Sequence, residues 1–154
     1  MIQRRTSVVL AAAALAVVAL AQSAMAQDAR VAQQVKLRQS AYTVLGAQMG
    51  QMGAMASGRA PFDAATFRTA AERAAFMGAY VSDLFPAGST SPASKAKAEL
   101  WQQQADFQKL MKDMQAKTAA LANVAKGGDL EAIKPAFGAA GASCKACHDK
   151  YKAD

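Results

Sequence analysis

Residues that break helices cluster in three short stretches of this 154-residue chain, at positions 58–61, 86–92 and 127–128. Between them the sequence is rich in Ala, Gln, Lys, Met and Leu, which are good helix formers. Signals for β-strands are almost absent. The sequence therefore predicts four helical segments, and short connections between helices favour antiparallel neighbours. We expect an all-α protein folded as an antiparallel four-helix bundle.

The spacing of apolar residues supports this architecture. In the first helical segment one stripe steps by four and three residues in turn, through Val31, Val35, Arg38, Tyr42, Leu45, Met49 and Met52. Such steps place side chains on one face of a helix. In the third segment Leu100, Phe107, Met114 and Leu121 recur every seven residues. Asp63 and Asp129 are placed to cap the second and fourth helices.

The first 26 residues have the pattern of a secretory signal peptide. Arg4 and Arg5 precede an apolar run over residues 8–21, and Ala24 and Ala26 fit a small-x-small cleavage site. A membrane anchor is the alternative, but this run is short for a bilayer span of about 20 residues. We expect cleavage after Ala26, which leaves residues 27–154 as one periplasmic domain without a membrane span.

Charge gives a weaker indication of partners. The chain has a formal net charge of +7, and two of its 18 basic residues leave with the signal peptide. The remaining excess is spread along the sequence without a dense basic block. This pattern does not favour nucleic acid as a partner, and it suits an acidic redox protein.

The two cysteines and the one histidine of the chain lie within five residues, as Cys144, Cys147 and His148. A structural zinc site needs four ligands, and these are three. A thioredoxin-like pair usually follows a strand, and none is predicted. C-x-x-C-H is also the pattern of covalent haem attachment. Because residues i and i+3 share a helix face, both sulfurs can reach the vinyl groups of one porphyrin, with the histidine beneath the iron.

We therefore expect one covalent haem c per chain, attached at Cys144 and Cys147, with His148 as the axial iron ligand. At this point the sequence resembles the class II c-type cytochromes, and most closely the cytochrome c′ family. The resemblance extends over nearly all of residues 27–154, in the segments VKLRQSAY, APFDAATF, LFPAGST, KAELW and AFGAAGASCKACHDKYK. It implies an exported four-helix bundle that carries haem. Because nothing in the sequence supplies a general base or a substrate pocket, we expect a carrier or a gas trap and not an enzyme.

The resemblance also assigns residues around the haem. It implies that Arg38 and Gln39 lie in the region of the haem propionates, where an anionic partner would stabilise a buried guanidinium. An arginine that extends into solvent is the alternative. Glu99 matches a position near the haem, although a surface glutamate at a helix start is equally compatible. Lys152 matches a basic residue next to the axial histidine, and a solvated lysine at a helix end is its alternative.

The sixth coordination position decides between functions. In low-spin members of the family the ligating methionine lies four residues after the position of Arg38, where this chain has Tyr42. Met49, Met52 and Met55 lie at least two turns, about 11 Å, further along the helix. A neutral phenol with a pKa near 10 is a poor iron ligand. We therefore expect a five-coordinate, high-spin iron with Tyr42 in a crowded distal pocket.

The leading hypothesis is a periplasmic cytochrome that binds nitric oxide and carbon monoxide, passes single electrons to a periplasmic redox protein, or does both. The resemblance also implies a homodimer packed through the first two helices. A six-coordinate, low-spin electron carrier with a methionine ligand is the alternative. A haem-free helical module is a third possibility. Lys145 and Lys150 are expected to contribute to a positive rim around the haem edge.

Overall fold

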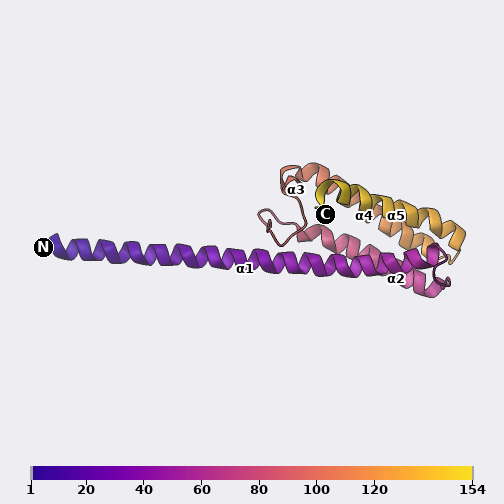
Figure 1. Ribbon diagram of the computed structural model, residues 1–154, viewed down its shortest axis with the longest axis horizontal. Helices are drawn as coiled ribbons and strands as arrows, with labels where there is room; N and C mark the ends of the chain where they lie inside the picture. The colour runs from indigo at the N-terminus through magenta and orange to yellow at the C-terminus, as the bar shows by residue number, and fades with distance from the viewer. Residues whose placement is uncertain (1, 154) are drawn as a thin grey trace.

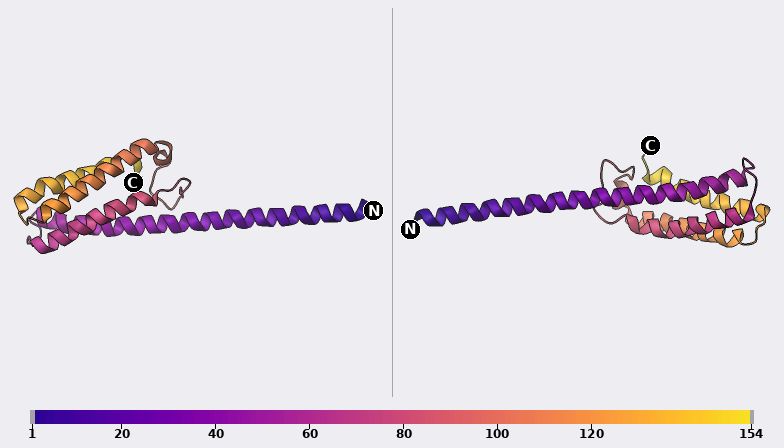
Figure 2. Two further views of the ribbon diagram at one scale, coloured as in Figure 1. Left: turned by 180° about the vertical axis from the view of Figure 1, so that it is seen from behind. Right: turned by 90° about the horizontal axis from the view of Figure 1, so that it is seen from below.

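A computed structural model describes residues 2–153, with side chains described at position 22 and over residues 25–153. Four long helices form the fold: α1 (Ile2–Ala56), α2 (Ala64–Val81), α4 (Gln104–Ala125) and α5 (Leu130–Tyr151). The second half of α1 packs with the other three as a bundle, and its first half extends beyond them (Figures 1 and 2). The predicted four-helix bundle is confirmed. Within the described residues, no helix has the length and hydropathy of a membrane span.

Helix ends follow the local signals in the sequence. Asp63 precedes α2 in an extended conformation and accepts a hydrogen bond from the backbone N–H of Thr66 at 2.7 Å. Asp129 caps α5 in the same way, through the N–H of Glu131 at 3.0 Å. Gly58 follows α1 with a φ of 75°, a left-handed conformation that glycine adopts without strain. Both predicted caps are confirmed.

The third helical segment differs from its prediction. The 3-10 turn η1 (Ser82–Leu84) follows α2, and the four-residue helix α3 (Glu99–Gln102) precedes α4. Leu100 therefore lies in α3, separate from Phe107 in α4. The break falls at Gln103, whose φ of −115° and ψ of 45° are not helical, and whose N–H closes onto the carbonyl of Glu99. No glycine or proline marks this position, so the heptad spacing suggested one continuous helix.

Two clusters of buried side chains form the core. The alanine cluster joins all four long helices at the end of the bundle near residues 57–63, and its buried members are Leu45, Met52, Met55, Phe67, Ala70, Ala71, Ala74, Leu121, Ala122, Ala125, Ile133 and Ala140. The aromatic cluster lies toward the C-terminus of α5, and its buried members are Ala41, Val81, Leu84, Leu100, Phe107, Met111, Met114 and Tyr151.

The segment 85–98, between η1 and α3, is held against the end of α5. The N–H of Lys97 donates to the carbonyl of Tyr151 at 2.9 Å, and the N–H of Ala153 donates to the carbonyl of Lys95 at 2.8 Å. Ala96 and Lys152 are paired in antiparallel fashion between them. These backbone contacts bring the middle of a long connection to the part of α5 that carries the cysteines and the histidine.

Candidate functional site

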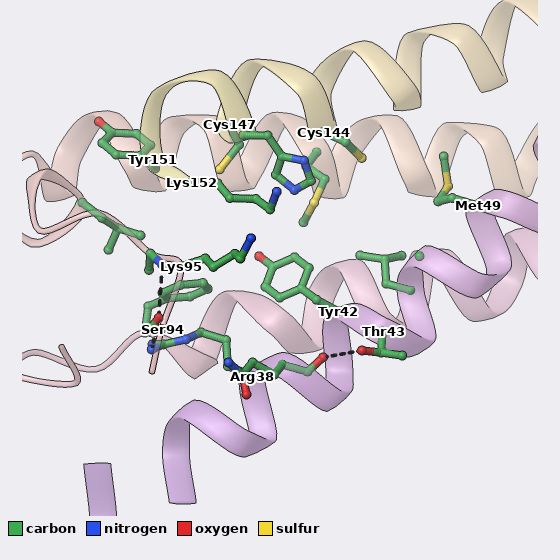
Figure 3. A pocket seen from close by; sticks show the side chains of 18 of the residues that line it. Arg38, Tyr42, Thr43, Met49, Ser94, Lys95, Cys144, Cys147, Tyr151 and Lys152 are labelled. Atoms are coloured by element: carbon green, nitrogen blue, oxygen red, sulfur yellow. Dashed lines mark hydrogen bonds between the residues drawn. The ribbon is translucent and has the colours of Figure 1, made fainter. Parts of the chain in front are cut away.

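A cavity of about 830 Å³ lies between α1, α5 and the segment 85–98. This volume falls within the range of about 300–1,000 Å³ that is usual for cofactor and ligand sites. Its wall is mostly apolar and includes Leu100, Phe107 and Met114. Figure 3 shows the cavity with the two cysteines on one side and Tyr42 and Arg38 on the other. A large, planar and largely apolar group would match this lining.

The cysteines come from successive turns of α5, and Cys144, Cys147 and His148 all line the cavity. Neither cysteine is in a disulfide. Burial raises the pKa of Cys144, and burial together with Cys144 raises the pKa of Cys147 to about 11. Catalytic redox cysteines have a lowered pKa, so these thiols do not fit a thioredoxin-like pair. Within the described residues, no three His, Cys, Asp or Glu side chains gather to hold a metal ion.

His148 is suited to coordinate iron. Its side chain lines the cavity while part of the residue stays exposed to solvent. Desolvation, followed by the charge of Lys152, lowers the pKa of His148 below its ordinary value. A lowered pKa keeps the imidazole neutral at physiological pH, and the neutral form is the one that binds a metal.

Tyr42 lies on α1, across the cavity from the cysteines (Figure 3). Its ring packs edge-on against Phe85, with centroids 6.2 Å apart, and its hydroxyl is 4.0 Å from Sδ of Met111. Burial, then the two cysteines, raises the pKa of Tyr42 above its ordinary value of 10. The phenol is therefore protonated at neutral pH and is a bulky neutral group on this wall.

The methionines of α1 divide into two groups. Met52 and Met55 are buried in the alanine cluster, as expected for residues that fill the core. Met49 differs, because it lines the cavity on the side of Cys144 as well as packing against that cluster (Figure 3). From the sequence we expected all three methionines to lie too far along the helix to reach the site. For Met49 this expectation is wrong, because Met49 lines the cavity.

Arg38 is buried, with 4% of its surface exposed, so the alternative in which it extends into solvent is wrong. Its guanidinium donates to the carbonyls of Leu84 and Ser89 and to the hydroxyls of Ser89 and Ser94, at 3.1–3.2 Å. It also lies 4.7 Å from the ring centre of Phe85. Burial lowers the pKa of Arg38 from 12.5, and arginine remains charged at any physiological pH.

The neighbouring Gln39 donates from Nε2 to the carbonyl of Ala93 at 2.8 Å. Both Arg38 and Gln39 line the cavity, as expected for residues in the region of the propionates. The hydrogen bonds of their side chains, however, all run to residues 84–94. The geometry makes the pair a clamp on the segment that closes this side of the cavity.

The lysines are distributed differently from the prediction. Lys145 is paired with Asp149 at 2.6 Å and Lys150 with Asp106 at 2.8 Å, so neighbouring carboxylates offset the positive rim expected from them. Lys152 lines the cavity, as does Lys95 from the segment 85–98. Sequence reasoning missed Lys95, and no local pattern marks it. Glu99 is exposed and is not among the residues of the cavity wall.

Comparison with known proteins identifies this arrangement. A family model described as cytochrome c′ matches residues 33–152. The chain belongs to the cytochrome c′ family. The cytochrome c′ of Alcaligenes xylosoxydans xylosoxydans is 36% identical over 124 residues, which cover 80% of this chain and 96% of the relative. Members of this family are haem proteins without enzymatic activity, as expected.

Solved structures agree with the fold. Cytochrome c prime from Shewanella frigidimarina is 43% identical with a TM-score of 0.78, and the match covers 80% of this chain and 97% of that one. A nitric oxide complex of a mutant cytochrome c prime from Alcaligenes xylosoxidans is 35% identical with a TM-score of 0.76, over 80% and 96% of the two chains. A carbon monoxide-bound variant of the same protein has the same identity and TM-score, over 80% and 97%.

The cytochrome c′ family implies covalent haem c, and the residues around the cavity fit that group. Cys144 and Cys147 present two thiols from one helix face to an apolar cavity, beside the neutral imidazole of His148. The far side of the cavity carries cations, in Arg38 and Lys95, that suit the carboxylates of the haem. The donor set and the lining are therefore those that a covalent haem requires.

Proposed function

We propose that this protein is a periplasmic cytochrome with a five-coordinate, high-spin haem c that binds nitric oxide and carbon monoxide, transfers single electrons, or does both. The observation that carries the proposal is Tyr42. This protonated, partly buried phenol lies across the cavity from the cysteines, where a low-spin relative would need a strong sixth ligand.

Each residue of the site has a separate role in this proposal. Cys144 and Cys147 would hold the haem by two thioether bonds, and His148 would supply a nitrogen ligand to its iron. When bound, the haem supplies a redox-active iron with a coordination position for a diatomic molecule. Tyr42 would restrict the space across the cavity from the cysteines, and its hydroxyl would be a hydrogen-bond donor there. Small uncharged ligands that displace the ring are therefore favoured over larger ones.

Relatives support the choice of ligands. The nitric oxide complex and the carbon monoxide-bound form described above are those of mutants of one relative. The cavity of this chain has the same fold around it and a mostly apolar lining. We extend nitric oxide and carbon monoxide binding to this protein on that basis. The low-spin alternative rests on Met49, the one methionine of the first-helix group that lines the cavity.

An absorption spectrum tests the proposal. The full chain is expressed together with haem maturation machinery, and the purified protein is examined in its ferric and ferrous forms. We expect covalent haem with high-spin features, and new bands on addition of nitric oxide or carbon monoxide. Low-spin features in both forms would favour methionine ligation. A protein without covalent haem would support the helical module.

Export and assembly belong to the same proposal. We propose that the signal peptide is cleaved after Ala26 and that the mature protein forms a homodimer through α1 and α2. Large apolar side chains remain exposed on these helices, among them Leu37 and Val44 on α1 and Phe76 and Tyr80 on α2, with Phe76 71% exposed. Analytical ultracentrifugation checks the assembly: the wild type is expected to sediment as a dimer and Phe76→Asp as a monomer. A monomeric wild type would contradict it.

A further inference from the structure

Cations gather on the side of the cavity that lies away from the cysteines. Arg38 and Lys95 are on this side, and Figure 3 shows the Lys95 side chain directed into the space in front of Tyr42. The ion pairs of the described residues involve other lysines, at positions 134, 145 and 150. A positive charge beside an apolar cavity, with no carboxylate to meet it in the described part of the chain, suits an anion on the cavity's occupant.

The two terminal nitrogens of Arg38 are already engaged. Each terminal nitrogen of its guanidinium carries two N–H groups, and each makes two hydrogen bonds to residues 84–94. A turn of the guanidinium toward a carboxylate would release one or more of these contacts. Arg38 therefore acts on the segment 85–98, as a positioning residue, more than on a ligand in the cavity.

Lys95 has the opposite arrangement. Its ammonium makes no hydrogen bond or ion pair within the residues that the structure describes. Its backbone, in contrast, is held from two sides: the carbonyl of Lys95 accepts from the N–H of Ala153 at 2.8 Å, and the adjacent Ser94 accepts from Arg38 at 3.1 Å. The hydroxyl of Ser94 also accepts from the N–H of Ala96 at 3.1 Å. A fixed backbone thus presents a free ammonium to the cavity.

The chemistry of haem c gives this ammonium a partner. Thioether bonds form at the vinyl substituents, and the two propionates lie on the opposite edge of the porphyrin. With the cysteines on one wall, the propionates of a bound haem would point toward the other. We propose that Lys95 binds a haem propionate directly, while Arg38 holds the segment 85–98 that presents it. This inference rests on the proposed function, since it requires covalent haem in the cavity.

Three variants of the full, haem-loaded chain test the inference. Lys95→Gln removes the charge, and Lys95→Arg keeps it. Lys97→Gln is the matched control, because Lys97 lies in the same segment and has the same charge but is not among the residues of the cavity wall. Each protein is examined by resonance Raman spectroscopy for the propionate bending mode, and by redox titration at low ionic strength.

We expect Lys95→Gln to shift the propionate mode and to move the reduction potential to more negative values. Loss of a nearby positive charge stabilises the ferric state relative to the ferrous state. Lys95→Arg should restore both properties, and Lys97→Gln should leave the propionate mode unchanged. A wild-type propionate mode in Lys95→Gln would overturn the inference, as would an equal shift in Lys97→Gln.

Ser94→Ala tests the positioning role of Arg38, because it removes one of the acceptors that join Arg38 to this segment. We expect a partial shift of the propionate mode with normal haem content. A wild-type mode in Ser94→Ala would remove the positioning role. Covalent haem content is measured in every protein. Its absence from the wild type would refute the proposed function itself, and is thereby distinguished from failure of the Lys95 inference alone.

Discussion

The two ends of the bundle bury their side chains in different ways. At the end near residues 57–63, the alanine cluster brings four helices together through small side chains, and of its buried members only Leu45 reaches the cavity wall. Further along α2, a Cβ at the buried Gly78 would lie 2.9 Å from Oγ1 of Thr118 in α4, so these two helices approach closely there as well. At the other end, half of the buried aromatic cluster lines the cavity.

This difference shows which end of the bundle is packed by the side chains of the protein alone and which end needs a bound group to fill it. Apolar groups that fill a cavity contribute about 24 cal/mol per Å³. If a bound group fills only a tenth of the 830 Å³ cavity, it contributes about 2 kcal/mol, against about 5–15 kcal/mol for the whole stability of a domain. The alanine end is packed by the chain's own side chains, whereas the cavity end depends on its occupant.

The largest effect is expected when the haem cannot be attached. In Cys144→Ala/Cys147→Ala, the melting temperature should fall by roughly 10 °C or more, because the tethered haem fills the apolar cavity only in the folded state. Hydrogen exchange measured by mass spectrometry should accelerate in residues 85–98 and 141–151, and change least around the alanine cluster. The wild-type chain produced without haem maturation is the matched control. If hydrogen exchange accelerates equally at both ends of the bundle, the cavity end does not depend on the haem more than the alanine cluster does.

Replacement of Arg38 should weaken the cavity end without touching the other. Arg38→Ala removes the four hydrogen bonds of the buried guanidinium and takes this donor away from the carbonyls of Leu84 and Ser89. We expect a loss of about 2–4 kcal/mol in the free energy of unfolding, measured with urea. Faster exchange should be confined to residues 85–98. The stability of Arg38→Lys should lie between that of the wild type and that of Arg38→Ala. If Arg38→Ala is as stable as the wild type, Arg38 does not hold the segment 85–98.

Tyr42 and Met52 provide a paired test on one helix, one at each end. Displacement of a packed ring from its rotamer costs about 0.5–1.5 kcal/mol, so Tyr42→Ala should bind carbon monoxide roughly two- to tenfold faster in stopped-flow measurements. Met52→Ala should lower stability by about 2–5 kcal/mol and leave the association rate unchanged. An unchanged rate in Tyr42→Ala would count against a gating role.

The smallest effect is expected at the cap of α2, far from the cavity. Hydrogen bonds from the side chain and backbone N–H of Thr66 lower the pKa of Asp63. Asp63→Ala should reduce the melting temperature by about 3–5 °C and leave the visible spectrum unchanged. A lowered pKa contributes stability above the unfolded value, and the contribution disappears as pH falls through the folded value. The difference between variant and wild type in calorimetry should therefore shrink below about pH 4.

Local signals predicted much of the fold. The caps Asp63 and Asp129, and the reversals near Gly58 and Gly128, depend on residues within a few positions of each other, and they appear as expected. The break at Gln103 was missed. It depends on the fit of α3 between the segment 85–98 and the bundle, and contacts of this kind leave no local pattern in the sequence.

The residues of the site likewise fall into those with a local signal in the sequence and those that depend on distant contacts. Cys144, Cys147 and His148 were predictable because one helix turn sets their relation, and resemblance to the family placed Tyr42 on the opposite wall. Lys95 was not predictable. It reaches the cavity because its backbone pairs with residue 153 at the end of α5, 58 positions further along the chain.

The sequence by itself determined the four helices and the haem-binding motif. These depend on periodicity and on neighbours along one helix, which adjacent residues specify. Only the tertiary structure decided that Arg38 holds the segment 85–98 and that Lys95 faces the cavity. Both depend on contacts between backbone groups that are distant in the sequence. The packing of the whole chain determines which of these groups come into contact.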